Sequence, residues 1–238
     1  MARFSFETSL RSAIVAAAQA LNRSGASFST FERAYCNERY WIRTPQGGFQ
    51  IRPEVTPADG IRNLFIEGRK YGFECATAMV IVLYKAVLDS IDESEFNRLF
   101  ADMLLYDWHY DSDLQLIESQ GSSQAVPGDI MYFKNPEVSP LRPEWKGENV
   151  VKLDEYSYYG HGIGIRTAEH IIRTLNSHRW PGSIVSAYLT DQIIHPDFNY
   201  LSHFAPGNNL NTDITPLQIE ANERAVLAAV GRRQYIRY

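Results

Sequence analysis

Cysteine is scarce in this sequence. Cys36 and Cys75 are the two cysteines among 238 residues, and their spacing fits neither a metal-ligand set nor a disulfide-rich framework. We therefore expect free thiols in a reducing compartment, and we expect neither a metal site nor a cofactor. Cys36 has no candidate base among its neighbours, which favours a structural role for it.

Long apolar runs and an excess of positive charge are also lacking. No stretch approaches the ~20 apolar residues of a membrane-spanning helix. The 23 basic and 28 acidic residues give a net charge of −5, which argues against a broad nucleic-acid surface or binding to anionic membranes. Residues 13–18 superficially imitate a signal peptide, but Glu7 and Arg11 precede a run that is too short and continues as an amphipathic helix. We therefore expect synthesis in the cytoplasm without a signal peptide.

The remaining composition predicts a folded α+β protein. Hydrophobic residues make up 45% of the chain, enough for a substantial core, and we find no internal repeat. A change in composition beyond His195 divides a main domain, 1–194, from an extension, 195–238, that we expect to be a linker followed by a helix packed on the domain. Periodicity and turn signals predict the elements as follows: helices at 8–22, 28–35, 57–65, 92–100, 168–177 and 215–230; strands at 40–43, 49–52, 104–110, 127–133, 145–151, 158–165 and 183–189; and a loop at 111–125.

Residues 72–84 organise the rest of the chain, because they place Cys75 directly before the most apolar run of the sequence. Such a run, apolar on every side, is typical of a central buried helix. A cysteine in the first turn of that helix lies near unpaired N–H groups and the positive end of the helix dipole, which favour the thiolate. A buried structural cysteine is the common alternative. Glu74 beside it favours a catalytic role.

A hairpin downstream supplies possible partners for Cys75. The strands predicted at 145–151 and 158–165 have a short connection and should pair antiparallel. If Leu153 pairs with Tyr158, Glu148 lies diagonal to His161 on one face. A slip of one residue in this pairing would put them on opposite faces. The alternative role of Glu148 is a solvated charge on a strand, and that of His161 is a structural residue of the hairpin. Glycines on both sides of His161 indicate close approach of another backbone or a substrate.

A thiolate at a helix start, with His and Glu on a hairpin packed over it, is a papain-like arrangement. Its chemistry is acyl transfer through a thioester, with helix-start N–H groups stabilising the oxyanion. The acceptor, water or an amine, separates hydrolases from transferases. Residue spacing leaves that choice open.

Five ordered motifs of the chain resemble those of the spore-coat transglutaminases of spore-forming bacteria, which are protein-glutamine gamma-glutamyltransferases. The resemblance runs from about residue 14 to residue 189. The motifs are Phe73-Glu74-Cys75-Ala76-Thr77-Ala78, Leu105-Tyr106-Asp107-Trp108-His109-Tyr110, Tyr132-Phe133-Lys134-Asn135-Pro136-Glu137, Trp145-Lys146-Gly147-Glu148-Asn149-Val150 and His161-Gly162-Ile163-Gly164-Ile165.

This resemblance implies a compact papain-like core that joins glutamine and lysine side chains of protein substrates by isopeptide bonds, without calcium. It makes Cys75 the nucleophile, Glu148 the general acid/base and Glu74 a carboxylate that assists or partly substitutes. His161 matches a histidine near the site. Trp108 and Trp145 match aromatic residues lining a tunnel, which would exclude the water that hydrolyses a thioester.

The sequence departs from the family pattern at both ends. A family segment before the first match has no equivalent here, and residues 195–238 have no counterpart that we identify. A more open tunnel would favour water as the acceptor and hence deamidation. One alternative is therefore a glutamine deamidase or papain-like amidase, including one that is the catalytic part of an effector. A catalytically silent structural protein is another. The resemblance also implies a place in the spore coat or a surface layer, with coat proteins as substrates, while the oligomeric state stays open.

Overall fold

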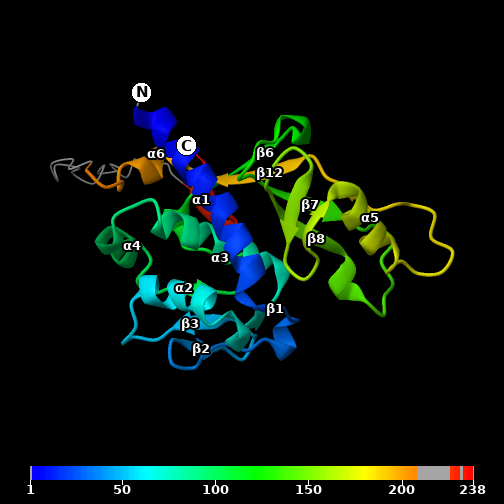
Figure 1. Cartoon of the computed structure of the whole chain (residues 1–238), viewed down its shortest axis with the longest axis horizontal. Coiled ribbons are helices and arrows are strands. Elements are labelled where there is room, and N and C mark those ends of the chain that lie inside the picture. The colour runs from blue at the N-terminus through cyan, green and yellow to red at the C-terminus, as the bar shows by residue number, and fades with distance from the viewer. Residues whose placement is uncertain (1, 208–225, 231–232, 238) are drawn as a thin grey trace. The chain divides into compact units, whose positions relative to one another are not determined.

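The computed structural model describes residues 2–207, 226–230 and 233–237. It has two compact units, Met1–Pro206 and Gly207–Tyr238. The first is an α+β fold in which the helices α1 to α4 lie beside a larger antiparallel sheet (Figure 1). No helix among the described residues is long and apolar enough to cross a membrane.

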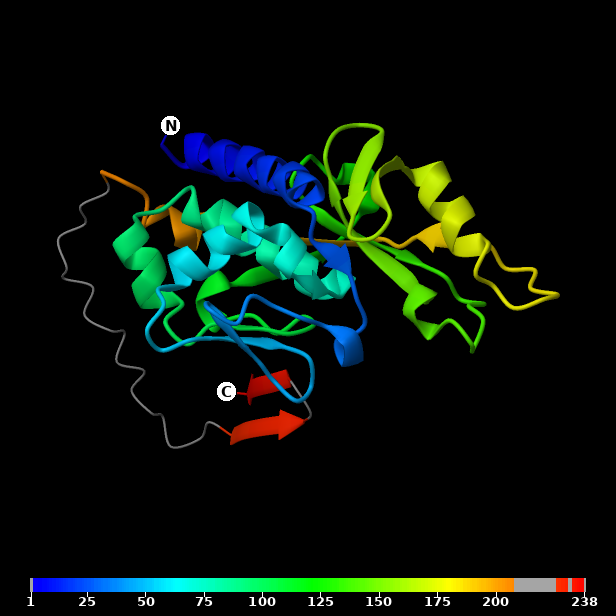
Figure 2. The ribbon, with the colours of Figure 1, turned by 60° about the horizontal axis from the view of Figure 1, so that its bottom comes forward.

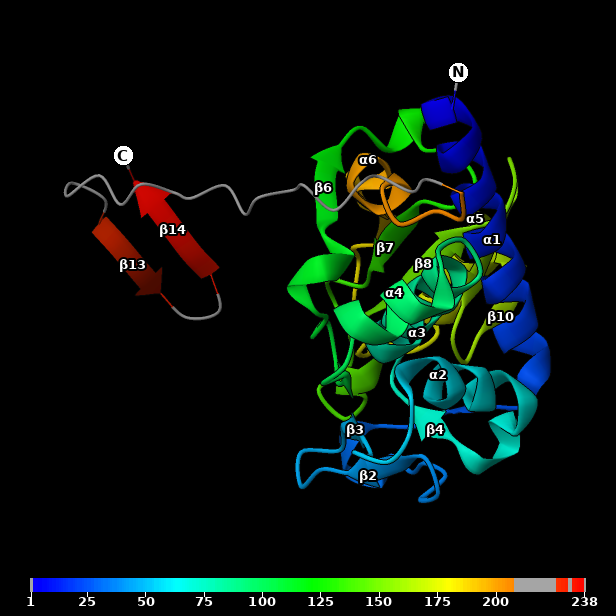
Figure 3. The ribbon, with the colours of Figure 1, turned by 90° about the vertical axis from the view of Figure 1, so that its left-hand side faces the viewer.

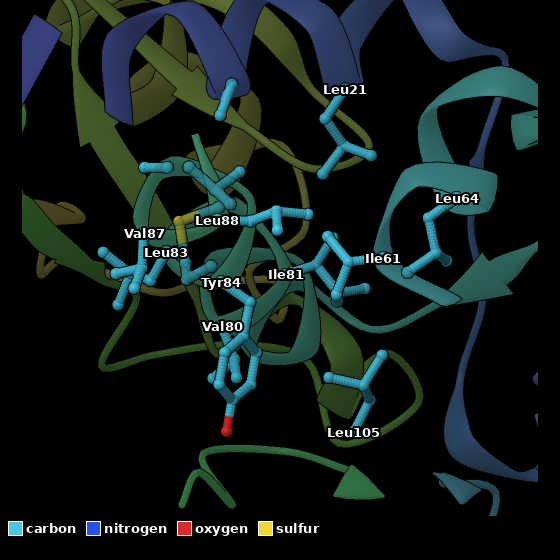
Figure 4. Close-up of a cluster of buried hydrophobic side chains, with 14 of the residues drawn as sticks. Leu21, Ile61, Leu64, Val80, Ile81, Leu83, Tyr84, Val87, Leu88 and Leu105 are labelled. Atoms are coloured by element: carbon cyan, nitrogen blue, oxygen red, sulfur yellow. The ribbon is translucent and has the colours of Figure 1, made fainter. Parts of the chain in front are cut away.

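Helix α3 (Cys75–Leu88) is the centre of the first unit, as its sequence predicts. Every residue from Cys75 to Tyr84 is buried. The apolar side chains of α3 between residues 80 and 88 lie in one buried cluster with Leu21, Ile61, Leu64 and Leu105 from other elements (Figure 4). Because the helix is apolar on all sides, it is stable only when other elements surround it.

Helix α1 (Ala2–Ser24) runs alongside α3 and α2 (Pro57–Ile66) in Figure 2. It is longer than the predicted 8–22, and the apolar face predicted for it is buried: Leu10, Ile14, Ala17, Ala18 and Leu21. The other two predicted helices of this part, α2 and α4 (Glu93–Leu99), are also present. Thr56 caps α2 by accepting a hydrogen bond from the Asp59 N–H at 3.1 Å, and Pro57 occupies the first turn.

A small sheet lies at the end of this unit opposite α6 (Phe198–Ser202) and β6 (Leu116–Gln120), as Figure 3 shows. Its strands lie in the order β2 (Trp41–Arg43), β3 (Phe49–Ile51) and β5 (Leu104–Leu105). Trp41 faces Ile51 across β2 and β3, so the hairpin predicted at 40–43 and 49–52 is confirmed.

The larger sheet holds the strands of the second half of the unit. Its order is β10-β9-β8-β7-β12-β6, with β11 paired to β7. Helix α5 (Ala168–Asn176) follows β10, and Ile171 and Leu175 pack with Phe133 and Val150 of the sheet. The bounds of the strands are β7 Ile130–Lys134, β8 Gly147–Lys152, β9 Ser157–Gly160, β10 Gly164–Thr167, β11 Tyr188–Leu189 and β12 Gln192–Pro196.

The predicted hairpin of 145–151 and 158–165 is present with two corrections. The second segment is two strands, β9 and β10, because the chain turns at Gly162, where φ is +101°. The observed register pairs Lys152, rather than Leu153, with Tyr158. This is the one-residue slip that reverses which side chains share a face.

Tertiary hydrogen bonds override three other local predictions. Residues 28–35 are no helix, because β1 (Ser27–Phe28) pairs in parallel with β4 (Gly72–Phe73) and a short 3-10 turn (Phe31–Arg33) follows. The strand predicted at 104–110 stops at Leu105, and of the strand predicted at 183–189 only β11 forms. The predicted loop 111–125 contains β6, which pairs with β12.

The compact unit extends past the predicted boundary at residues 194 and 195, which falls inside β12. Arg11 on α1 shows how the last segment is held. Its guanidinium binds Asp129 at 2.7 Å and lies 4.5 Å from the ring centre of Phe198 on α6. Residues 195–206 are therefore part of the first unit rather than a linker.

The second unit contains the antiparallel pair β13 (Val226–Val230) and β14 (Arg233–Arg237). The helix predicted at 215–230 falls outside the described residues up to 225, and its last five residues are strand β13.

His161 fastens the turn between β9 and β10 to the β1–β4 pair. Its Nδ1 lies 3.1 Å from the Tyr159 hydroxyl and its Nε2 lies 3.1 Å from the Ser27 carbonyl oxygen. The ring stacks on Phe73 with centroids 4.5 Å apart. The carbonyl can only accept, so Nε2 carries the proton and Nδ1 accepts from the tyrosine. Burial lowers the pKa of His161 to about 4.

Folding therefore favours neutral His161, and the free energy of unfolding should fall as pH drops from about 6.5, the unfolded pKa, towards about 4. His161→Gln should destabilise the protein at pH 7 by about 1–3 kcal/mol, because buried partners lose their bonds, yet flatten this pH dependence. Urea unfolding at several pH values measures both effects. His203→Gln, at an exposed position, is the control. An unchanged slope in His161→Gln would contradict this role.

Candidate active site

Cys75 is the first residue of α3 and opens onto a cavity of about 830 Å³. Its side chain is almost entirely buried, at 4% exposure. Glu74 is the N-cap of the same helix: Oε2 accepts the Ala76 N–H at 2.8 Å, and Oε1 accepts the thiol hydrogen at 3.2 Å. The capping carboxylate is thus also the direct hydrogen-bond partner of the thiol.

Asn149 on β8 contacts the sulfur from the other side, with its Nδ2 at 3.5 Å from Cys75 Sγ. Its cross-strand partner on β7 is Tyr132, and both residues line the cavity. Burial, followed by Cys75, Glu74 and Glu148, raises the pKa of Tyr132 to about 12, so its hydroxyl keeps its proton.

Asn149 and Tyr132 are not among the site residues predicted from the sequence. Alternate residues of a strand face opposite sides, so the assignment of Glu148 to the site gave no indication of its neighbour Asn149. The packing of β8 against α3 brings Asn149 to the sulfur, and that packing depends on the tertiary fold.

The resting thiol is neutral, contrary to the prediction of a thiolate favoured by the helix start. Burial raises the pKa of Cys75 well above its usual value, and the charges of Glu148 and Glu74 raise it further. Hydrogen bonds from the backbone and side-chain N–H groups of Asn149 act in the opposite direction. In this site, loss of solvation and two carboxyl groups outweigh the helix dipole.

Glu148 is a buried carboxyl group within electrostatic reach of Cys75 and Glu74. Its side chain is 4% exposed and its Oε1 has no hydrogen-bond partner among the described residues. Burial, and then the charge of Glu74, raises its pKa well above the usual value. Gly160 makes room for it, because a Cβ there would lie 2.6 Å from Glu148 Oε1. The glycine before His161 therefore accommodates a protein side chain.

His161 takes a different position from the one that the predicted register gave it. Both ring nitrogens bond to Tyr159 and Ser27, as described above, and His161 is not among the described residues that line the cavity. The structure places Glu74 in hydrogen-bond contact with Cys75. Glu148 lies within electrostatic reach of both but is not among the described residues that line the cavity. His161 supports the β1–β4 pair that precedes Glu74 and Cys75.

The two tryptophans that were predicted to line the tunnel have different surroundings. Trp108 lines the cavity, in a turn where Asp107 has φ +52° and donates its N–H to Thr77 Oγ1 on α3 at 3.0 Å. Trp145 stacks on His178 with centroids 3.8 Å apart, and the described lining residues do not include it. Its chain neighbours Glu144 and Lys146 do line the cavity.

A thiol that donates to one carboxylate, beside a second carboxyl group whose pKa is raised by burial, is equipped for nucleophilic attack on a carbonyl and for proton transfer. Two carboxyl groups in unlike surroundings are a common source of an acid and base pair. Among the described residues, no group of three or more His, Cys, Asp and Glu side chains is placed to hold a metal ion.

Comparison with known proteins identifies relatives along most of the chain. Residues 1–205 match the family model described as protein-glutamine gamma-glutamyltransferase. The protein of that name from Bacillus mycoides (strain KBAB4) is 47% identical over 227 residues, which are 95% of this chain and 81% of that protein. Its counterpart from Bacillus cereus (strain B4264) is 45% identical with the same coverage.

A solved structure agrees with these relatives. The transglutaminase from Geobacillus stearothermophilus, without its C-terminal extension, is 51% identical and superposes with a TM-score of 0.83, covering 86% of this chain and 98% of that chain. Because 95% of this chain aligns with the Bacillus mycoides protein, most of residues 195–238 have a counterpart there, which corrects the expectation that they have none. The chain belongs to the protein-glutamine gamma-glutamyltransferase family.

Proposed function

We propose that the chain joins protein glutamine and lysine side chains through ε-(γ-glutamyl)lysine isopeptide bonds, with Cys75 as the nucleophile. The observation that carries this proposal is the Cys75 thiol, which opens onto the cavity and donates to Glu74 at 3.2 Å. The names of its relatives support the same reaction. Deamidation through the same thioester is less favoured by them.

In the first half of the reaction, Cys75 Sγ bonds to the carboxamide carbon of glutamine and the carbon–nitrogen bond breaks. Glu74 takes the thiol proton through its existing hydrogen bond. That proton then passes to the departing nitrogen, which leaves as ammonia. Glu148, whose pKa is raised by burial and by Glu74, is the general acid/base that shares the proton with Glu74.

In the second half, the amine of lysine attacks the thioester carbon, the carbon–sulfur bond breaks and the amine's proton returns to the sulfur. The carboxyl pair again holds that proton during the transfer. Trp108 at the cavity supplies an apolar surface for the aliphatic part of a glutamine or lysine side chain and excludes water from the thioester. Independence from calcium stays a prediction from the family resemblance.

Coat proteins of a bacterial spore are the substrates that we propose, and a spore coat or surface layer is the proposed location. Support comes from the resemblance of the five motifs to those of spore-coat transglutaminases, and the relatives described above are from Bacillus mycoides and Bacillus cereus. Absence of the chain from the coat fraction of purified spores would remove this part of the proposal.

Purified protein should incorporate a fluorescent primary amine into a glutamine-rich protein and release ammonia in step with it, because each acyl transfer frees one ammonia. Cys75→Ala should abolish both signals, since it removes the thioester. Fluorescence in a gel and enzymatic ammonia determination give the two quantities. Ammonia release that does not change when the amine is added would show that water is the acceptor.

Replacement of the carboxyl groups should show that they share one proton. Glu74→Gln and Glu148→Gln should each lower kcat by about 10²-fold or more, within the usual range of general acid–base catalysis. Each single variant should keep some activity, because the remaining carboxyl group still accepts the proton. The double variant should fall to the Cys75→Ala level. Steady-state amine incorporation measures this series.

Glu169→Gln, at an exposed position on α5, is the matched control and should behave as the wild type. Full activity in either single variant, with the fold intact by circular dichroism, would exclude that carboxyl group from the proton transfer.

A further inference from the structure

One N–H group at the start of the Cys75 helix already has a hydrogen-bond acceptor. When the sulfur attacks a carbonyl carbon, the carbonyl oxygen becomes an oxyanion that needs hydrogen-bond donors close by. The unpaired N–H groups at a helix start are the usual source. Here the Ala76 N–H donates to Glu74 Oε2 at 2.8 Å. The carboxylate that receives the thiol proton thereby occupies a donor that the oxyanion would otherwise use.

Asn149 provides donors at the same sulfur from the facing strand. Its side-chain Nδ2 lies 3.5 Å from Cys75 Sγ, and its backbone N–H is also directed at the sulfur. This is possible because Asn149 lies just outside the region where β8 and β9 pair. The pairing runs from Val150 to Lys152 of β8.

Tyr132 is the neighbour of Asn149 across the β7–β8 pair. Both residues line the cavity, and the hydroxyl of Tyr132 donates to the Lys146 carbonyl oxygen at 3.3 Å. Glu74 and Glu148 each offer a carboxyl group to the sulfur's surroundings, whereas the amide of Asn149 offers hydrogen-bond donors that stabilise negative charge.

We propose that the side-chain amide of Asn149 is a further catalytic residue of the acyl transfer: it donates to the Cys75 sulfur before attack and to the carbonyl oxygen of the tetrahedral intermediate after it. In the attack the charge moves from sulfur to the oxygen two bonds away, so a donor held against the sulfur needs to move little to follow it. This assignment depends on the proposed function, with Cys75 as nucleophile.

Two variants test the role of Asn149. Asn149→Ala removes the amide, and Asn149→Asp keeps its shape while replacing the donor with a carboxylate. Both should lower kcat by about 10²–10³-fold, the usual cost of one oxyanion donor, with KM for a glutamine donor changed only a few-fold. Asn22→Ala, at an exposed position on α1, is the matched control. Circular dichroism and thermal unfolding verify that the variants are folded.

The pH dependence of Cys75 alkylation by iodoacetamide gives a second readout that requires no turnover. Mass spectrometry of the Cys75 peptide separates it from Cys36. Loss of the amide donor should move the alkylation midpoint to higher pH in both variants, and further in Asn149→Asp, because the new carboxylate adds negative charge beside the sulfur. A purely structural residue would change stability without moving this midpoint.

The outcomes separate the two levels of the proposal. Absence of amine incorporation by the wild type would overturn the proposed function, while the alkylation series would still decide whether Asn149 donates to the sulfur. Wild-type incorporation, with folded Asn149 variants that keep kcat within about threefold of the wild type, would overturn the role of Asn149. A raised KM with unchanged kcat would overturn it too, since that pattern indicates uniform substrate binding.

Discussion

The loss of solvation around the Cys75 sulfur is the constraint on which the rest of the site depends. At 4% exposure, the sulfur bears a negative charge only at high cost in free energy. The surroundings respond in two opposite ways. Two carboxyl groups keep the proton on or near the sulfur, and the donors of Asn149 favour its departure. The resting protein therefore holds a protonated, buried thiol.

Glu74 connects this chemistry to the stability of α3. A carboxylate at the N-cap position normally serves the helix alone, by accepting from its first N–H groups. In this chain one oxygen does so and the other receives the thiol hydrogen. Helix capping thus fixes the direction of the group that accepts the proton, and no separate loop is required to hold it.

The sequence predicted those structural features that depend on the residues of a single segment. The apolar run after Cys75 predicted a buried helix, and the polar Glu74 before it predicted chemistry at its start. Features that depend on pairing between segments were not predictable. The register of β8 and β9 differs by one residue from the expected one, which places His161 on structural partners, and residues 27–28 form a strand only because residues 72–73 lie beside them. Trp145 shows the same limit, since its stacking on His178 joins residues far apart in the chain.

The pairing of β1 with β4 has a mechanical consequence. Residues 30–33, which form part of the cavity wall, follow β1 after Ser29, and Glu74 and Cys75 directly follow β4. Backbone hydrogen bonds between the two strands, such as the one from Ser29 N–H to the Phe73 carbonyl oxygen at 2.9 Å, tie the wall to the segment that bears the thiol. The strand pair therefore joins part of the cavity wall and the thiol-bearing segment into one hydrogen-bonded unit.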